Sequence, residues 1–184
     1  MPKVSEAHKE ERRRQILDGA RTAFAQHGYD GATVRRLEEA TGLSRGAIFS
    51  YYPTKWDLFF ALATADLQET GTRWLDGGVE AVVRHIGTQD TDWLAVYLEI
   101  GRMLRTDPQL RASWQQRDPE LDDRLRDSVL AGQADGTYRS DVPVASIGAF
   151  VGLVLDGLAL HRAAGYEVDV EATLVLLRSA LAPK

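Results

Sequence analysis

The segment from residue 143 to residue 160, PVASIGAFVGLVLDGLAL, is apolar around the whole circumference of a helix. A helix with no polar face must be covered on every side. Its glycines at 148, 152 and 157 let a neighbouring backbone approach closely. In a chain of 184 residues, we expect one side of this helix to meet a second copy of the chain.

Composition places the chain among ordinary globular proteins. Apolar residues make up 44% and charged residues 27%, and the absence of cysteine excludes disulfides and thiolate metal sites. The longest nearly uncharged apolar run, residues 142–155, is shorter than the roughly 20 residues that a membrane span needs. The charged start, MPKVSEAHKEERRR, lacks an apolar leader region. We therefore expect a cytoplasmic protein with no membrane partner.

Apolar residues recur at helical spacing along nearly the whole chain, and sustained strand-like alternation is missing. The sequence predicts an all-α protein. Glycines at 28 and at 77–78 are expected to end helices, and Thr54 with Asp57 has the form of a capping box. The expected helices are 8–27, 33–41, 44–53, 54–73, 79–87, 92–105, 108–115, 119–133, 143–164 and 168–182.

Charge is distributed unevenly between the two ends. Residues 1–55 hold ten basic and seven acidic side chains, a formal charge of +3, whereas residues 56–184 hold twelve basic and twenty acidic ones, or −8. A basic end on an acidic body is typical of a protein that presents one face to a polyanion. We therefore expect a nucleic-acid-binding domain over 1–55 and a second domain over 56–184.

Residues 33–55, TVRRLEEATGLSRGAIFSYYPTK, have the pattern of a helix-turn-helix. Two short helices flank the turn at 41–42, and the second begins with Ser44, Arg45 and Gly46. Small and polar residues at that point suit entry into the major groove of double-stranded DNA. Thr33, Tyr51 and Lys55 are placed to hold phosphates.

The run AFAQHGYDGATVRRLEEATGLSRGAIFSYYPTKWDLFFAL resembles the N-terminal domain of TetR-family repressors. The resemblance implies an N-terminal three-helix DNA-binding domain, a C-terminal helical domain for ligand binding and dimerisation, and a palindromic operator bound by a homodimer. It departs from the commonest family pattern at Ser50, where an aromatic residue or histidine is frequent. The DNA contacts it implies are Thr33, Ser44, Arg45, Gly46, Ser50, Tyr51 and Lys55.

Two assignments in this segment stay open. One of Arg35 and Arg36 is expected to contact DNA and the other to lie on the surface, and their spacing does not choose between them. Tyr51 is expected to bind phosphate, with a place in the core as the alternative.

The effector site is sought among charged residues on otherwise apolar helices, because a buried charge needs a partner or a ligand. The candidate ligand-binding residues on this ground are Glu99, Arg102, Arg126, Asp156 and His161. The alternative for Asp156 is a simple pair with an arginine.

The blocks ATVRRLEEATGLSRGAIF and LEIGRMLRTDPQLRASW are similar to the actinobacterial aconitase repressor branch of the family. That similarity implies a carboxylate effector such as citrate, with no obligatory cofactor but with Mg²⁺ accompanying the ligand. Arginines would then meet carboxylates, while Glu99, Asp156 and His161 would hold the metal. The alternative is a regulator of efflux or lipid genes that responds to an apolar drug or acyl ligand in an aromatic pocket.

An enzyme is not expected. The chain has no Gly-rich nucleotide loop, no HExxH motif and no cysteine nucleophile, and its four histidines are scattered at 8, 27, 85 and 161.

Overall fold

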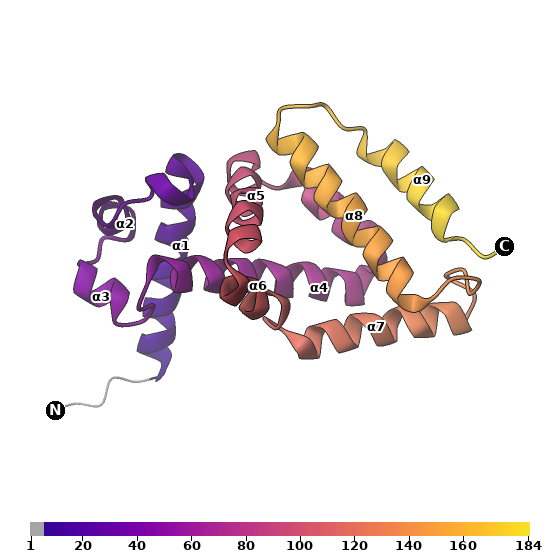
Figure 1. Cartoon of the computed structure of the whole chain (residues 1–184), viewed down its shortest axis with the longest axis horizontal. Coiled ribbons are helices and arrows are strands. Elements are labelled where there is room, and N and C mark those ends of the chain that lie inside the picture. Colours follow the sequence, from indigo (N-terminus) through magenta and orange to yellow (C-terminus); the bar gives the residue numbers. More distant parts are fainter. Residues whose placement is uncertain (1–5) are drawn as a thin grey trace. The chain divides into compact units, whose positions relative to one another are not determined.

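The computed structural model describes residues 6–184, except for the side chains of Glu99 and Arg102, and every regular element in that part is a helix. The predicted all-α class is confirmed. Figure 1 labels the helices as α1 (Glu6–Gly31), α2 (Val34–Thr41), α3 (Arg45–Phe49), α4 (Lys55–Thr88), α5 (Thr91–Thr106), α6 (Pro108–Gln115), α7 (Pro119–Ala134), α8 (Val144–Ala163) and α9 (Val170–Leu181).

Two of these helices contain a glycine break that the sequence predicts. Gly28 interrupts α1 with φ 68°, and Gly78 interrupts α4 with φ 71°. Both angles lie in the left-handed region, which glycine enters without a steric penalty. Past Gly78 the chain folds back along the first part of α4. The distance of 3.8 Å between His85 Nε2 and Glu69 Oε1 shows this reversal. In a straight helix, residues this far apart would be separated by about 24 Å.

The chain divides into two compact units, one ending at Ala65 and the other beginning at Asp66, so the boundary falls inside α4. In the first unit, the rings of Phe24, Tyr29 and Phe59 pack together with centroids 5.6–5.7 Å apart. α1 and α2 approach so closely that a Cβ added at Gly19 would lie 2.7 Å from the Cα of Thr41.

The second unit has its core between the later part of α4, α5, α7, α8 and α9. Apolar side chains from all five helices meet there, and the members from α9 are Leu174, Leu177 and Leu181. These three leucines form one apolar stripe along α9. Since the stripe is used within the chain, only the other side of α9 is available to a partner.

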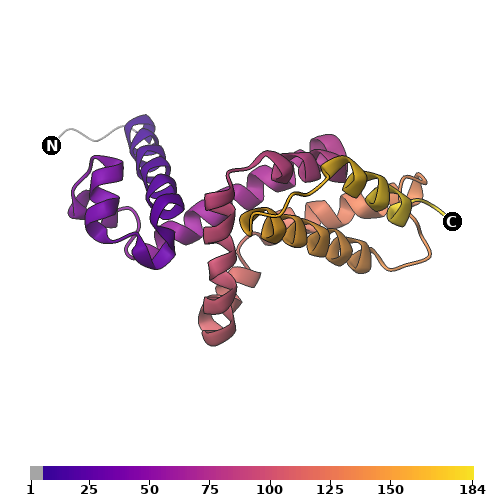
Figure 2. The same cartoon turned by 90° about the horizontal axis from the view of Figure 1, so that it is seen from above.

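α8 leaves much of its apolar surface uncovered. Leu153 is 72% exposed, and Phe150 and Leu160 are also exposed. By length and composition alone this 20-residue helix could cross a membrane, and only 22% of its most apolar window is buried. Both Figure 1 and Figure 2 show the chain reversing after α8 and returning as α9, which exposes Val175 and Leu176.

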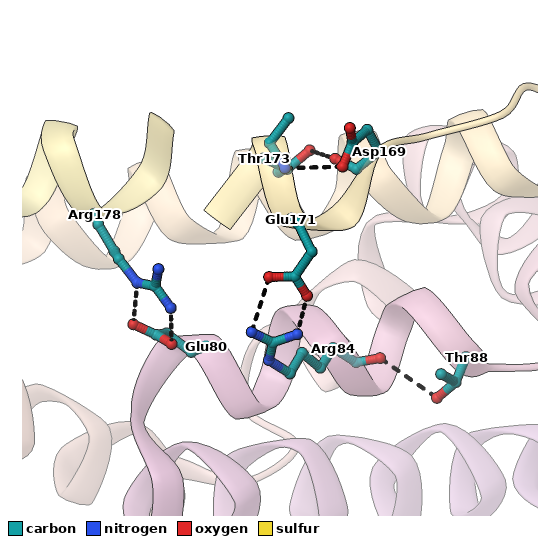
Figure 3. A network of polar contacts seen from close by, with 8 residues as sticks. Glu80, Arg84, Thr88, Asp169, Glu171, Thr173 and Arg178 are labelled. Carbon is teal, nitrogen blue, oxygen red and sulfur yellow. Dashed lines mark hydrogen bonds and ion pairs between the residues drawn. The ribbon is translucent and has the colours of Figure 1, made fainter. Parts of the chain in front are cut away.

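Two ion pairs join α9 to the segment of α4 after Gly78 (Figure 3). Arg178 donates through Nε and a terminal nitrogen to the two carboxylate oxygens of Glu80. Arg84 pairs in the same two-point manner with Glu171, and one of its bonds is 3.0 Å long. Such geometry fixes the register of the two helices. We refer to these four residues as the α4–α9 clasp.

The ion pair between Glu80 and Arg178 predicts a coupling free energy for unfolding that depends on pH. Glu80→Gln and Arg178→Gln, made singly and together, should reveal a coupling free energy of about 0.5–1 kcal/mol, the upper range for exposed pairs. Hydrogen bonds from Arg178 lower the pKa of Glu80 from its ordinary 4.5. The coupling is therefore complete above pH 4.5 and is lost as the pH falls through the lowered value. Urea unfolding at neutral and acidic pH measures it, and a coupling unchanged by acid would contradict the assignment.

Candidate functional site

The turn between α2 and α3 is held by backbone and side-chain caps. Gly42 adopts φ 68° and donates its N–H to the carbonyl of Glu38. The side chain of Glu38 in turn accepts a 2.6 Å bond from the backbone N–H of Arg45, at the first residue of α3. This carboxylate neutralises the positive end of α3. Sequence reasoning did not single out Glu38, because an acid on a basic face looks like a solvated residue.

The start of α3 presents small and polar groups to solvent. Ser44 is the N-cap and accepts a bond from the N–H of Ala47, while Ser44, Arg45 and Gly46 are all exposed. A Cβ added at Gly46 would meet no described atom within 4 Å. Packing within the chain therefore does not require glycine at this position. Ser50, at the other end of α3, is exposed and donates its hydroxyl to the Ala47 carbonyl.

Two cationic side chains, from α4 and from α2, donate to carbonyls at the C-terminal end of α1. Lys55 Nζ donates to the carbonyls of Tyr29 at 2.8 Å and Asp30 at 3.4 Å, and it lies 4.6 Å from the centroid of the Tyr29 ring. Arg36 donates to the carbonyl of Gly31 at 2.8 Å. Positive groups at this end complement the helix dipole. Because an ammonium has three N–H donors, Lys55 still has one for a further acceptor.

The remaining predicted DNA contacts differ in their surroundings. Arg35 has a side chain 87% exposed and pairs with Glu39 of the next turn at 2.8 Å. Thr33 is the exposed N-cap of α2 and accepts from the N–H of Arg36. The Tyr51 ring is partly buried and lies 5.9 Å from the guanidinium of Arg13.

A cavity of about 340 Å³ lies within the second unit. The rings of Trp93, Tyr97 and Trp114 line it from α5 and α6, and aliphatic side chains of α4 and α8 complete the walls. Its charged lining residues are Asp66, Arg117 and Asp156. An apolar enclosure with a few polar groups is typical of small-molecule sites.

The charged residues of the cavity are held differently. The Asp66 carboxylate accepts a hydrogen bond from the indole N–H of Trp93. Arg117 donates to the carbonyl of Trp114 at 2.6 Å, and its guanidinium stacks 4.7 Å from the centroid of that ring. Asp156 is an exposed residue; desolvation by the cavity wall raises its pKa, and the charge of Arg117 partly offsets that rise.

Of the five predicted ligand residues, the structure places Asp156 in the cavity lining. Arg126 is exposed on α7 and pairs with Asp123 at 3.3 Å, whereas His161 is exposed and packs edge-on against Tyr166. The side chains of Glu99 and Arg102 lie outside the described residues. Among the residues that are described, no three His, Cys, Asp or Glu side chains gather into a metal-binding group.

Sequence reasoning missed Asp66 and Arg117. Asp66 sits on a long helix among other polar residues, where it resembles a solvated position. Arg117 lies in a turn between α6 and α7. The one available signal was its place three residues after Trp114, which allows a guanidinium to reach back over the ring.

Comparisons with known proteins agree on one family. Residues 16–62 match the model described as "Bacterial regulatory proteins, tetR family". An HTH-type transcriptional repressor of Mycobacterium tuberculosis is 46% identical, over 90% of this chain and 89% of that protein. The HTH-type transcriptional repressor AcnR of Corynebacterium glutamicum is 44% identical over 85% of each.

Solved structures show the same fold. Salmonella enterica GusR aligns with a TM-score of 0.75 at 20% identity, covering 98% of this chain and 99% of its own. The fatty acid degradation regulator FadR from Bacillus halodurans gives 0.67 at 17% identity, covering 90% and 95%.

The contacts of Lys55 predict a role in stability. Lys55→Met removes the donor to two carbonyls at the end of α1, which should lower the free energy of unfolding by about 1–2 kcal/mol. Arg35→Met is the control; it removes only an exposed pair and should change stability by less than about 0.5 kcal/mol. Urea denaturation measures both variants. Equal losses would mean that Lys55 does not hold the end of α1.

Proposed function

This chain belongs to the tetR family of bacterial regulatory proteins, and on that premise we propose that it binds a near-palindromic operator as a homodimer under the control of a small-molecule effector. The relatives of 42–46% identity are transcriptional repressors, and the chain is a DNA-binding transcriptional repressor rather than an enzyme. We place its action in the cytoplasm, where the DNA is found.

The observation that carries DNA recognition is the exposed start of α3. Ser44, Arg45 and Gly46 are all accessible there, and Gly46 leaves open space that a close-lying DNA backbone or base edge would fill. We propose that Arg45 and Ser50 face the bases, while Thr33, Tyr51 and the third N–H of Lys55 hold phosphates.

The choice between Arg35 and Arg36 now has a basis. Arg36 is engaged with the carbonyl of Gly31, whereas Arg35 has only an exposed pair with Glu39. An exposed ion pair is weak and is easily exchanged for a phosphate. We propose Arg35 as the DNA contact and Arg36 as a group that orders the end of α1.

The division of roles predicts different effects on DNA binding. Arg45→Ala should cost about 1–3 kcal/mol on the operator and relax sequence choice, because a base contact is lost. Lys55→Met, checked to be folded, should weaken all duplexes about equally and reduce the salt slope by roughly one. Fluorescence anisotropy on operator and scrambled duplexes at several salt concentrations measures both. If the two variants lose affinity in the same way on every duplex, the assignment fails.

The homodimer is supported by the uncovered apolar face of α8 and α9. Leu153 and Leu176 are each more than 70% exposed, and exposed leucines on adjacent helices are costly in water. A two-fold interface uses the same patch on both copies. The apolar face of one copy would therefore cover the same face of the other. Adding a Cβ at Gly157 would meet no described atom within 4 Å, so this glycine faces space that a second helix can enter. We propose that a second copy of this chain occupies the face.

Leu153→Lys tests the interface. A lysine buried in an apolar contact loses its hydration, so the variant should be monomeric and should lose cooperative operator binding. Ala112→Lys on α6, where the residue is also exposed, is the control and should remain dimeric. Sedimentation and circular dichroism distinguish dissociation from misfolding. A folded Leu153→Lys dimer would move the interface elsewhere.

We propose that the cavity of the second unit binds the effector and that the effector is citrate, or a close tricarboxylate, with Mg²⁺. The lining supports this in its chemistry, since Arg117 suits a carboxylate and the oxygens of Asp156 and Asp66 are ligands that Mg²⁺ accepts. Of the predicted cation ligands Glu99, Asp156 and His161, the two with described side chains are Asp156, which lines the cavity, and His161, which does not. Mg²⁺ would supply positive charge that neutralises part of a highly anionic ligand.

A second candidate has its own support. The three aromatic rings of the cavity also suit an apolar drug or acyl ligand. In this alternative, the carboxylates would meet the positive charge of a drug.

Asp156→Asn tests whether the carboxylate of this residue binds the metal. Citrate with Mg²⁺ should raise the melting temperature of the wild type, since it binds the folded state. The variant should lose the dependence on Mg²⁺ but keep operator binding without ligand. Because the raised pKa of Asp156 favours its protonated form, Mg²⁺ dependence should also fade at a higher pH than an ordinary aspartate would give. Tight binding of ethidium without any heat from citrate would favour the second candidate.

A further inference from the structure

The side chain of Arg117 is fixed but incompletely satisfied. One terminal nitrogen donates to the carbonyl of Trp114, and the guanidinium stacks on the ring of the same residue. Its Nε is buried and has no hydrogen-bond partner among the described residues. A buried donor without an acceptor costs free energy, so a group that remains in this state is a candidate for binding something from outside the chain.

The charge of Arg117 acts on two neighbouring carboxylates, because it favours the ionised forms of Asp118 and Asp156. Asp118 adjoins Arg117 in sequence, but its carboxylate accepts from the N–H of Leu121 at 3.0 Å and from Gln68 at 3.1 Å. Asp66 accepts a hydrogen bond from the indole N–H of Trp93, and Asp156 interacts with Arg117 through charge. The buried Nε–H of Arg117 is nevertheless left without an acceptor among the described residues.

The position of Arg117 at the cavity wall strengthens the interaction of its guanidinium with an anion. Trp93, Tyr97 and Trp114 line the same cavity and limit the water that can screen the guanidinium. In such surroundings a charge-assisted hydrogen bond is stronger than one in open solvent. The stacked ring also holds the planar group in one orientation, which reduces the entropy lost when an anion binds.

We infer that Arg117 recognises the effector, and that the effector is a small organic anion whose carboxylate lies against this guanidinium and whose second polar group contacts Asp156. This inference rests on the proposed effector role of the cavity. The second group is either a hydroxyl of the ligand or a bound divalent cation, and Asp156 accepts either. Arg126, which is exposed and paired with Asp123, takes no part.

The test measures binding of citrate with Mg²⁺ by calorimetry to the full-length chain. Arg117→Gln should weaken binding at least tenfold, and Arg117→Lys should recover part of the loss because it restores the charge without the planar geometry. Arg126→Gln is the matched control and should stay within twofold of the wild type. Circular dichroism and operator binding without ligand should be unchanged in all three variants.

Two further probes identify the contact to Asp156. Tricarballylate has the three carboxylates of citrate but no hydroxyl, and citrate with a chelator lacks the cation. Weaker binding of tricarballylate than of citrate when both are measured with the chelator assigns the hydroxyl to Asp156. Weaker binding of citrate only after chelation assigns the cation.

Ethidium distinguishes recognition from a structural role. Removal of a positive charge should strengthen binding of this cation to Arg117→Gln while citrate binding weakens. If Arg117→Gln weakens both probes equally, or binds citrate as the wild type does, the inference is wrong although the cavity still binds an effector. If the wild type binds ethidium and no anion, the cavity recognises cations and the inference is again wrong. If the wild type binds none of these probes, the proposed effector role of the cavity fails as well.

Discussion

The reversal of the chain at Gly78 is the constraint on which the second unit depends. Its left-handed backbone angle turns the rest of α4 back along the part before it. As a result, Asp66 and Leu67 from before the break and Ile86 from after it line the same cavity. The same reversal presents Glu80 and Arg84 to α9, so the cavity wall and the α4–α9 clasp share one short segment. Any other residue at this position would have to enter a conformation that costs roughly 1–2 kcal/mol.

Local chemistry made much of the fold predictable. The breaks at Gly28 and Gly78 follow from the conformations open to glycine, and the capping box is present, with Thr54 N–H donating to Asp57 at 2.9 Å and Asp57 N–H donating to Thr54 at 3.1 Å. The helix-turn-helix was equally predictable, because its glycine, caps and apolar positions all lie within residues 33–55. What periodicity could not assign was the partner of each apolar stripe. The leucines of α9 pack inside their own chain, and it is the other side of the helix that is exposed.

The cavity was less predictable than the DNA-binding segment for a physical reason. Its charged residues come from α4, α8 and the turn before α7, and contacts between such distant segments leave no spacing in the sequence. A search for charges on apolar helices found Asp156 but also selected Arg126 and His161, which the structure places on the surface outside the cavity lining. Arg117 was passed over because a turn arginine between polar residues has no apolar neighbours in sequence. Only the folded chain shows the ring beneath it.

The α4–α9 clasp makes the packing of α9 depend on ionic strength. Its carboxylates and guanidiniums are exposed, so dissolved ions screen them as they screen contacts with phosphates. A rise in ionic strength therefore acts at two places: it displaces the protein from DNA, and it loosens the helix whose outer side carries Val175 and Leu176. The contact between α9 and α4 and the affinity for DNA therefore both weaken as ionic strength rises. If a second copy packs on α9, as proposed, the salt exponent of DNA affinity should include ions that associate with the clasp as well as those displaced from phosphates.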